Sequence, residues 1–147
     1  MDINIEAKVI KAFFYKNKQE RLLFELTTKK RQEFIHKLNH RYQDFLNPEF
    51  IFQESKKFPE PKVLCDTMSS FGVSKKCYVF SEYEDFDGIY SDLETAVERL
   101  NCNGFASLIV GLPSGFTHFK AESDRSFQIN FYLKPRQRFD GLPWNKD

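Results

Sequence analysis

The chain contains few of the residues from which disulfide frameworks and membrane spans are built. It has three cysteines in 147 residues, an odd number without a CxxC pair, which argues against a disulfide framework and for a reducing compartment. No stretch comes near the roughly 18 consecutive apolar residues of a membrane span. The first residues include Asp2 and Glu6 and lack the basic start and apolar run of a signal peptide. We therefore expect a cytoplasmic protein.

Signatures of catalysis and of phosphate binding are also missing. The glycines between residues 104 and 115 are not followed by the Lys-Ser/Thr pair of a phosphate-binding loop. Ser107 and Ser114 lack the spacing of a nucleophile elbow, and no cysteine is paired with a histidine in the pattern of a thiol enzyme. The sequence therefore favours a protein without catalytic activity and without a cofactor.

Aromatic and charged side chains are what the chain has in quantity. Seventeen phenylalanines and 41% hydrophobic residues predict a phenylalanine-rich core, with a few rings left for a partner surface. The net charge of +1 conceals an uneven distribution. Residues 1–41 hold ten Lys/Arg against five Asp/Glu, whereas residues 82–98 hold seven carboxylates and no Lys or Arg. The length fits a single domain, residues 1–147.

The first half of the chain is predicted to be helical. Apolar residues recur at helical spacing over residues 3–16 and 28–46, and a shorter helix starts with a proline and covers residues 61–72. The apolar cluster at residues 22–26 fits either a helical turn or a short strand. Residues 48–60 have the composition of a polar connector.

In the second half the pattern changes to strands. Residues 77–81 form a short apolar strand, and two further strands flank a hairpin turn at residues 113–115. Ser91 and Glu94 have the spacing of a capping box, in which each side chain binds a free backbone amide at the start of a helix. Residues 127–133 alternate apolar and polar, so we expect one face of that strand to be buried and the other exposed.

Together these elements predict an α+β domain. The helical residues 1–72 are expected to pack on one face of a mainly antiparallel sheet of about four strands. Residues 77–134 supply this sheet as a strand, a helix and a meander. The tail, residues 135–147, contains Trp144, which we expect to anchor the tail on the domain.

The segment 82–92 is the most informative stretch of the chain. Its acidic residues are interspersed with aromatic rings. Closely spaced carboxylates can occupy a site built for phosphates, and rigid rings supply the anchors that interface hot spots favour. We therefore predict that this segment contacts a basic protein partner, as an immunity or antitoxin-type inhibitor would. The predicted contact residues are Glu82, Tyr83, Glu84, Asp85, Phe86, Asp87 and Tyr90.

Part of this segment also has the spacing of a calcium-binding loop. A loop that begins at Tyr83 would place Asp85, Asp87 and Gly88 at the third, fifth and sixth positions. Glu94 would then be the acid that closes the loop. However, Tyr83 stands where the first aspartate is required, and the capping box already explains Glu94. We therefore predict no metal here, and expect a turn before a helix whose dipole the acids complement.

One face of the predicted helix 28–46 suggests an alternative function. His36 and His40 are four residues apart, a spacing that can hold zinc, but Lys37 stands where a metalloprotease has its glutamate. The same face carries basic side chains that can neutralise phosphates, and a histidine there could serve as acid or base in RNA cleavage. The residues of this alternative nucleic-acid face are Lys29, Lys30, His36, Lys37, His40 and Arg41.

Several short motifs, spread over most of the chain, carry a resemblance to a known family. They are Lys29-Lys30-Arg31 running into His40, then Asp87-Gly88, Leu93-Glu94-x-Ala96, and Gly104–Gly115 with Phe119 and Glu122. This set resembles a family of small bacterial proteins without an assigned activity. The resemblance implies a bacterial origin and supplies no catalytic residues.

Overall fold

The computed structural model describes residues 1–101, 105–122 and 128–139. Within these ranges the chain forms five α-helices, three short 3-10 helices and six strands. The helices are α1 (Ile3–Phe13), α2 (Lys16–Leu26), α3 (Arg31–Arg41), η1 (Tyr42–Asp44), η2 (Pro48–Phe50), α4 (Pro61–Ser70), η3 (Glu84–Phe86) and α5 (Leu93–Asn101). The strands are β1 (Ile51–Ser55), β2 (Val73–Ser81), β3 (Ile89–Asp92), β4 (Ser107–Pro113), β5 (Thr117–Glu122) and β6 (Gln128–Leu133).

The six strands form one sheet in the order β1-β6-β5-β4-β2-β3. Every neighbouring pair is antiparallel. The two strands at the edges, β1 and β3, are both short. The first strand of the chain therefore pairs with the last, and the hairpin of β4 and β5 lies in the middle of the sheet.

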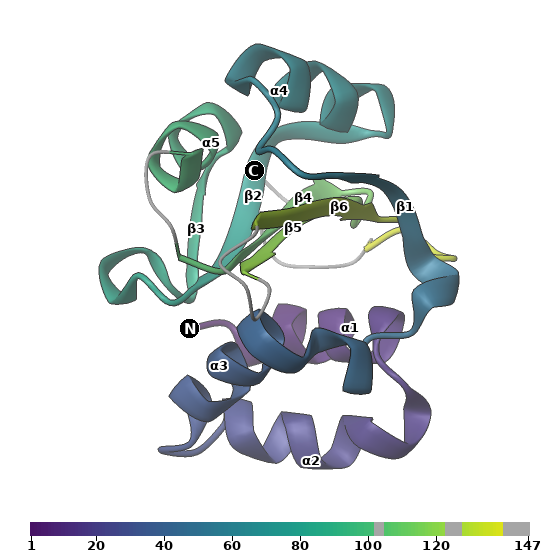
Figure 1. The fold of residues 1–147 in the computed structure, drawn as a ribbon, viewed down its shortest axis with the longest axis vertical. Helices are drawn as coiled ribbons and strands as arrows, with labels where there is room; N and C mark the ends of the chain where they lie inside the picture. The colour runs from purple at the N-terminus through teal and green to yellow at the C-terminus, as the bar shows by residue number, and fades with distance from the viewer. Residues whose placement is uncertain (102–104, 123–127, 140–147) are drawn as a thin grey trace.

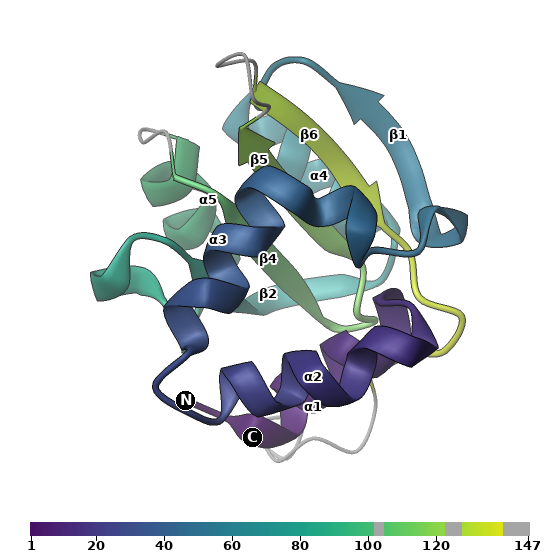
Figure 2. The same cartoon turned by 60° about the horizontal axis from the view of Figure 1, so that its bottom comes forward.

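Helices cover both faces of this sheet. In Figure 1, α1, α2 and α3 lie below the sheet, and α4 and α5 lie above it. The alternation of side chains along β2 explains the two layers, because Tyr78 and Phe80 face α1–α3 whereas Cys77 and Val79 face α4 and α5. Figure 2 shows α3 crossing the strands on the first face, with α1 and α2 beside it.

The predicted α+β class is confirmed, with two corrections to its details. The sheet has six strands instead of about four, since β1 lies in the presumed polar connector and β3 follows the acidic turn. The helix predicted in the second half is present as α5, but α4 and α5 pack on the face opposite α1–α3, so the helices cover two faces instead of one. Both missed strands are short edge strands, and neither shows the apolar alternation that identifies a half-buried strand.

One local alternative is decided, and two local predictions were wrong. Of the two alternatives for residues 22–26, the helix is correct, and it begins earlier, at Lys16. Ser91 lies in β3 and its hydroxyl donates to Asp92 O, so it does not form the predicted capping box. The face of β6 expected to be exposed is buried at Asn130 and Tyr132, because α4 packs over that side of the sheet. Trp144 lies outside the described residues.

Gly111 allows a close approach in the middle of the sheet, and we predict that a methyl group there destabilises the fold. A Cβ on Gly111 would lie 2.7 Å from Phe116 O and would also meet the Val73 side chain. We expect Gly111→Ala to lower the free energy of unfolding by about 1–3 kcal/mol in chemical denaturation.

Ser107→Ala on the same strand is the matched control. The Ser107 hydroxyl is buried and has no hydrogen-bond partner within the described part of the chain, so its removal should change stability by less than about 0.5 kcal/mol or raise it slightly. Equal stability of the Gly111→Ala variant and the wild type would show that β2 and β4 can separate without cost.

Candidate functional site

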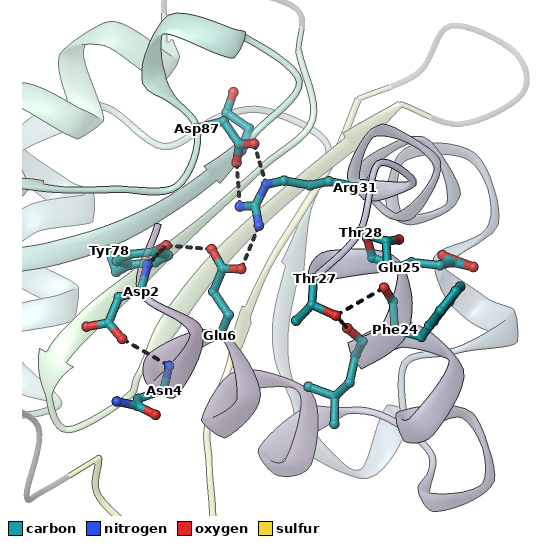
Figure 3. Close-up of polar contacts among 12 residues, drawn as sticks. Asp2, Asn4, Glu6, Phe24, Glu25, Thr27, Thr28, Arg31, Tyr78 and Asp87 are labelled. Atoms are coloured by element: carbon teal, nitrogen blue, oxygen red, sulfur yellow. Dashed lines mark hydrogen bonds and ion pairs between the residues drawn. The ribbon is translucent and has the colours of Figure 1, made fainter.

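A buried arginine joins the N-terminal helices to the sheet. Arg31, the first residue of α3, is 7% exposed. Its Nε lies 2.8 Å from Asp87 Oδ2, and its Nη2 lies 3.1 Å from Asp87 Oδ1. Its Nη1 lies 2.5 Å from Glu6 Oε1 on α1. The Tyr78 hydroxyl donates to the other Glu6 oxygen at 2.5 Å and accepts from Asp2 N at 3.1 Å. Figure 3 shows these contacts as one continuous chain.

The charges in this network stabilise one another away from water. Burial alone would lower the pKa of Arg31, but the hydrogen bonds and charges of Asp87 and Glu6 outweigh burial and raise it. Burial raises the pKa of Tyr78, and the hydrogen bond to Glu6 raises it further. At neutral pH Arg31 is therefore charged and Tyr78 is neutral, as the hydrogen bonds require. The planar guanidinium suits this role because it binds a carboxylate through two parallel bonds.

Asp87 also holds the acidic turn against β2. One of its oxygens accepts from Ser81 N at 3.0 Å. The next residue, Gly88, donates from its amide to Val79 O at 2.8 Å. Gly88 has a φ of +69°, and a Cβ there would lie 2.5 Å from Met1 Cγ, so both its conformation and its surroundings favour glycine. The turn is thus tied by side chain and backbone to the strand that precedes it.

The start of the turn has its own contacts to neighbouring elements. Glu82 Oε1 accepts from Asn39 Nδ2 on α3 at 2.8 Å and from Ala106 N at 2.9 Å. The ring of Tyr83 stacks on Phe105, with centroids 5.9 Å apart and planes at 7°. The segment therefore bridges α3 and the residues that lead into β4.

Of the seven residues predicted to contact a partner, three are exposed. Glu84, Asp85 and Tyr90 are exposed, whereas Glu82 and Tyr83 are half-buried. The other two, Phe86 and Asp87, are buried within the molecule. The surface that this segment offers is therefore smaller than the sequence suggested, and its role in binding stays a prediction.

The exposed carboxylates precede an edge strand that carries exposed apolar side chains. Ile89 is 36% exposed and Tyr90 is 38% exposed, both on β3. The Tyr90 hydroxyl donates to Asp2 Oδ2 at 2.5 Å, and its ring lies edge-on to Tyr78 at 4.9 Å. Tyr90 is thereby held in place while part of its ring faces solvent. We call Glu84, Asp85, Ile89 and Tyr90 the acidic edge.

The alternative nucleic-acid face is partly neutralised by acids of the same chain. Lys37 is paired with the buried Glu25 of α2. Arg41 is paired with Asp44 at 3.0 Å, and its guanidinium lies over a phenylalanine ring. The remaining residues of that face, Lys29, Lys30, His36 and His40, are exposed. The rings of His36 and His40 are 4.5 Å apart.

The buried network formed by Glu6, Arg31 and Tyr78 was not predicted from the sequence. One signal was present, because Glu6 lies four and seven residues before the buried Ile10 and Phe13 and so belongs to the apolar stripe of α1. A charged residue in such a stripe needs a buried partner of opposite charge. Which cation provides it depends on tertiary packing, and the pattern alone did not point to Arg31.

A second group of buried polar side chains lies on the other face of the sheet. His118 on β5 is 0% exposed, and its ring lies against Phe58 at 4.9 Å and Tyr132 at 5.5 Å. Burial lowers the pKa of His118 to about 3, with a smaller contribution from the charge of Lys120. The imidazole is therefore neutral at physiological pH.

Sites for metals are limited in the described ranges. There, no group of three or more His, Cys, Asp or Glu side chains is arranged to hold a metal ion. Burial raises the pKa of the Cys77 thiol to about 12, and Cys65 is half-buried. The calcium-loop spacing falls on η3 and β3, with Asp87 occupied by Arg31.

No helix in residues 1–101, 105–122 or 128–139 is long and apolar enough to cross a membrane.

Comparison with known proteins adds no relative. No family model, curated protein or solved structure matches this chain. The resemblance to a family of small bacterial proteins stays a prediction.

Loss of the Arg31 guanidinium is predicted to be costly. Arg31→Met keeps an aliphatic chain but leaves Asp87 and Glu6 buried without their cation. We expect the free energy of unfolding to fall by about 3–5 kcal/mol, measured by chemical denaturation. Arg41→Met, which removes an exposed ion pair on the same helix, should cost at most about 1 kcal/mol. Similar losses in the two variants would contradict a special role for the network.

His118 is predicted to make the protein sensitive to acid. An unfolded imidazole protonates near pH 6.5, whereas the pKa of folded His118 is about 3, so the unfolded state binds one more proton between these values. Stability should therefore fall as the pH falls below 6.5. Between pH 7 and pH 5 we expect a loss of up to about 2 kcal/mol that His118→Phe abolishes. The prediction is contradicted if the wild type and the His118→Phe variant lose the same stability between pH 7 and pH 5.

Proposed function

We propose that this chain is a small, non-catalytic binding protein of the cytoplasm that holds a basic protein partner on its acidic edge. The observation that carries the proposal is the way the buried network divides the acidic segment. Asp87 is turned inward onto Arg31, while Glu84, Asp85 and Tyr90 remain exposed beside it. The segment thus combines an anchored base with exposed carboxylates.

Rigidity supports the proposal because it reduces the entropic cost of binding. Asp87, Gly88 and Glu82 each hold the segment through hydrogen bonds to neighbouring elements. A binding loop that is already ordered loses less conformational freedom when a partner docks. The internal contacts of this turn are therefore useful to a binding surface.

The composition of the acidic edge also supports a protein partner. Tyr90 is an amphipathic ring in a defined position, the kind of side chain that is enriched in interface hot spots. Ile89 adds apolar surface beside it. Because β3 is an edge strand paired with β2, its other side has backbone groups available for a further strand.

Charge favours a basic partner. Of the seven carboxylates in residues 82–98, Asp87 and Asp92 are paired with Arg31 and Lys76, whereas Glu84 and Asp85 are exposed side by side. A local excess of negative charge of this kind speeds the encounter with an oppositely charged protein. An inhibitor of a basic toxin, such as an immunity protein or antitoxin, has this chemistry. The bacterial origin implied by the sequence resemblance fits such a role.

Nucleic-acid binding through α3 has less support. Two of its six proposed contact residues, Lys37 and Arg41, are already paired with Glu25 and Asp44. Since binding to phosphates depends on free positive charge, these pairs weaken the face. The alternative stays a prediction.

Reversing the exposed charges is predicted to abolish partner recovery. In affinity purification from the native cell, Glu84→Lys/Asp85→Lys should lower recovery of a basic partner at least tenfold, because like charges would then face each other. Tyr90→Ala should also reduce recovery, through loss of the ring contact.

The matched control is Glu20→Lys/Glu33→Lys, which changes the net charge equally at exposed positions on α2 and α3. It should retain the partner at the wild-type level. The proposal fails if both charge reversals recover the same proteins in the same amounts as the wild type.

A further inference from the structure

A cavity of about 310 Å³ lies on the face of the sheet opposite to α1–α3. Its walls come from β1, α4 and the middle of the sheet. They include Gln53, Ser55, Val63, Thr67, His118 and Asn130. The volume is at the lower end of the range of small-molecule pockets, about 300–1,000 Å³, so it fits a single ring system.

The cavity is lined by two buried side chains whose polar atoms lack partners. His118 is 0% exposed and Asn130 is 1% exposed. In the described part of the chain, neither ring nitrogen of His118 nor Asn130 Oδ1 has a hydrogen bond. The Asn130 Nδ2 donates to Gln128 Oε1 at 3.0 Å, which orients the free oxygen. Leaving such atoms unpaired costs stability, and buried polar groups in native proteins nearly always have partners.

The backbone beside the cavity is strained at the same place. Gln53 has a φ of +51°, in the left-handed region that non-glycine residues rarely adopt. The pairing of β1 with β6 shifts between Phe52 and Glu54, which makes Gln53 the extra residue of a bulge. Strained residues and bulges concentrate at binding sites, where they position neighbouring groups. This is the second, independent feature that distinguishes the cavity.

The unpaired atoms define what a ligand must offer. A neutral imidazole has one N–H donor and one acceptor nitrogen, and Asn130 Oδ1 is an acceptor. A complementary ligand therefore needs both a carbonyl oxygen and an N–H group. The three unpaired atoms belong to uncharged side chains, and burying a charged group beside them would be costly, so a neutral ligand is favoured at this point of the cavity. The carboxylate of Glu54 lines another part of the same cavity. The rings of Phe58 and Tyr132 favour a planar one.

We propose that this cavity binds a small, neutral, planar molecule bearing a carboxamide or lactam group, whose N–H and carbonyl pair with Asn130 and His118. The three unpaired atoms have no surface open to water, so binding requires the segment carrying Phe58 and Pro59 to move outward. Phe58 N donates to Gln128 Oε1 at 3.0 Å, one bond that tethers this segment to β6. The site is separate from the acidic edge and would serve a second ligand.

Nicotinamide and uracil are the probes, with benzylamine as the cationic comparison. Saturation-transfer NMR on the full chain should show saturable binding of at least one neutral probe, in the millimolar range or tighter, and weaker binding of benzylamine. His118→Phe keeps a ring of similar shape but removes both nitrogens. It should weaken the neutral probe at least tenfold while leaving the melting temperature equal or higher.

Two further measurements keep the result decisive. Ser69→Ala, which changes a residue of the separate 600 Å³ cavity between α4 and α5, should leave binding unchanged. In the wild type, methyl shifts caused by the probe should concentrate at Val63 and Thr67. The proposal is overturned if the wild type binds neither neutral probe, or if it binds benzylamine as tightly as the neutral probe. It is also overturned if the His118→Phe variant binds the neutral probe as tightly as the wild type, or if the methyl shifts lie away from Val63 and Thr67.

Discussion

The ion pair between Arg31 and Asp87, extended to Glu6, is the constraint on which the arrangement of this molecule depends. Its three members come from α3, from the turn before β3 and from α1, so one guanidinium sets the position of two helices against the sheet. Each charge is buried, and none of the three can be removed from water at low cost without the other two. The apolar packing of α1–α3 on the sheet is non-directional and is compatible with several similar helix positions. The bidentate hydrogen bonds of the arginine are directional, and they are compatible with one of these positions.

The sequence identified the class of the fold better than its layers. The periodic stretches predicted as a helix over residues 3–16 and a strand over residues 127–133 do contain α1 and β6, because burial of an apolar side imposes a period on the sequence. The exposure predicted for the other face of β6 was wrong. The edge strands β1 and β3 were missed, since an edge strand is held by backbone pairing that leaves little trace in side-chain pattern. The second helical layer was missed for a related reason. Once α4 covers the sheet, polar residues such as Asn130 are buried, and alternation no longer reports exposure.

Prediction of the candidate sites was also limited because tertiary contacts decide which side chains are buried. Acidic residues two positions apart have opposite environments, with Asp85 exposed and Asp87 buried, because tertiary structure decides which carboxylate meets Arg31. His118 gave no signal in the sequence, because its partners Phe58 and Tyr132 are distant along the chain. Reading charge along the sequence locates a segment of interest. The three-dimensional contacts determine which of its side chains face a partner.

The strand order has a consequence for how the chain reaches its native state. β1 at residues 51–55 pairs with β6 at residues 128–133, and α1 is tied to Tyr78 and, through Arg31, to Asp87. During synthesis, the helices and β1 therefore leave the ribosome before the strands and the carboxylate that they contact have been made. Closing such long loops is slow and leaves apolar surface exposed meanwhile. The polar bulge at Gln53 and the exposed side chains of β1 disfavour pairing of this strand with other chains before β6 has been synthesised.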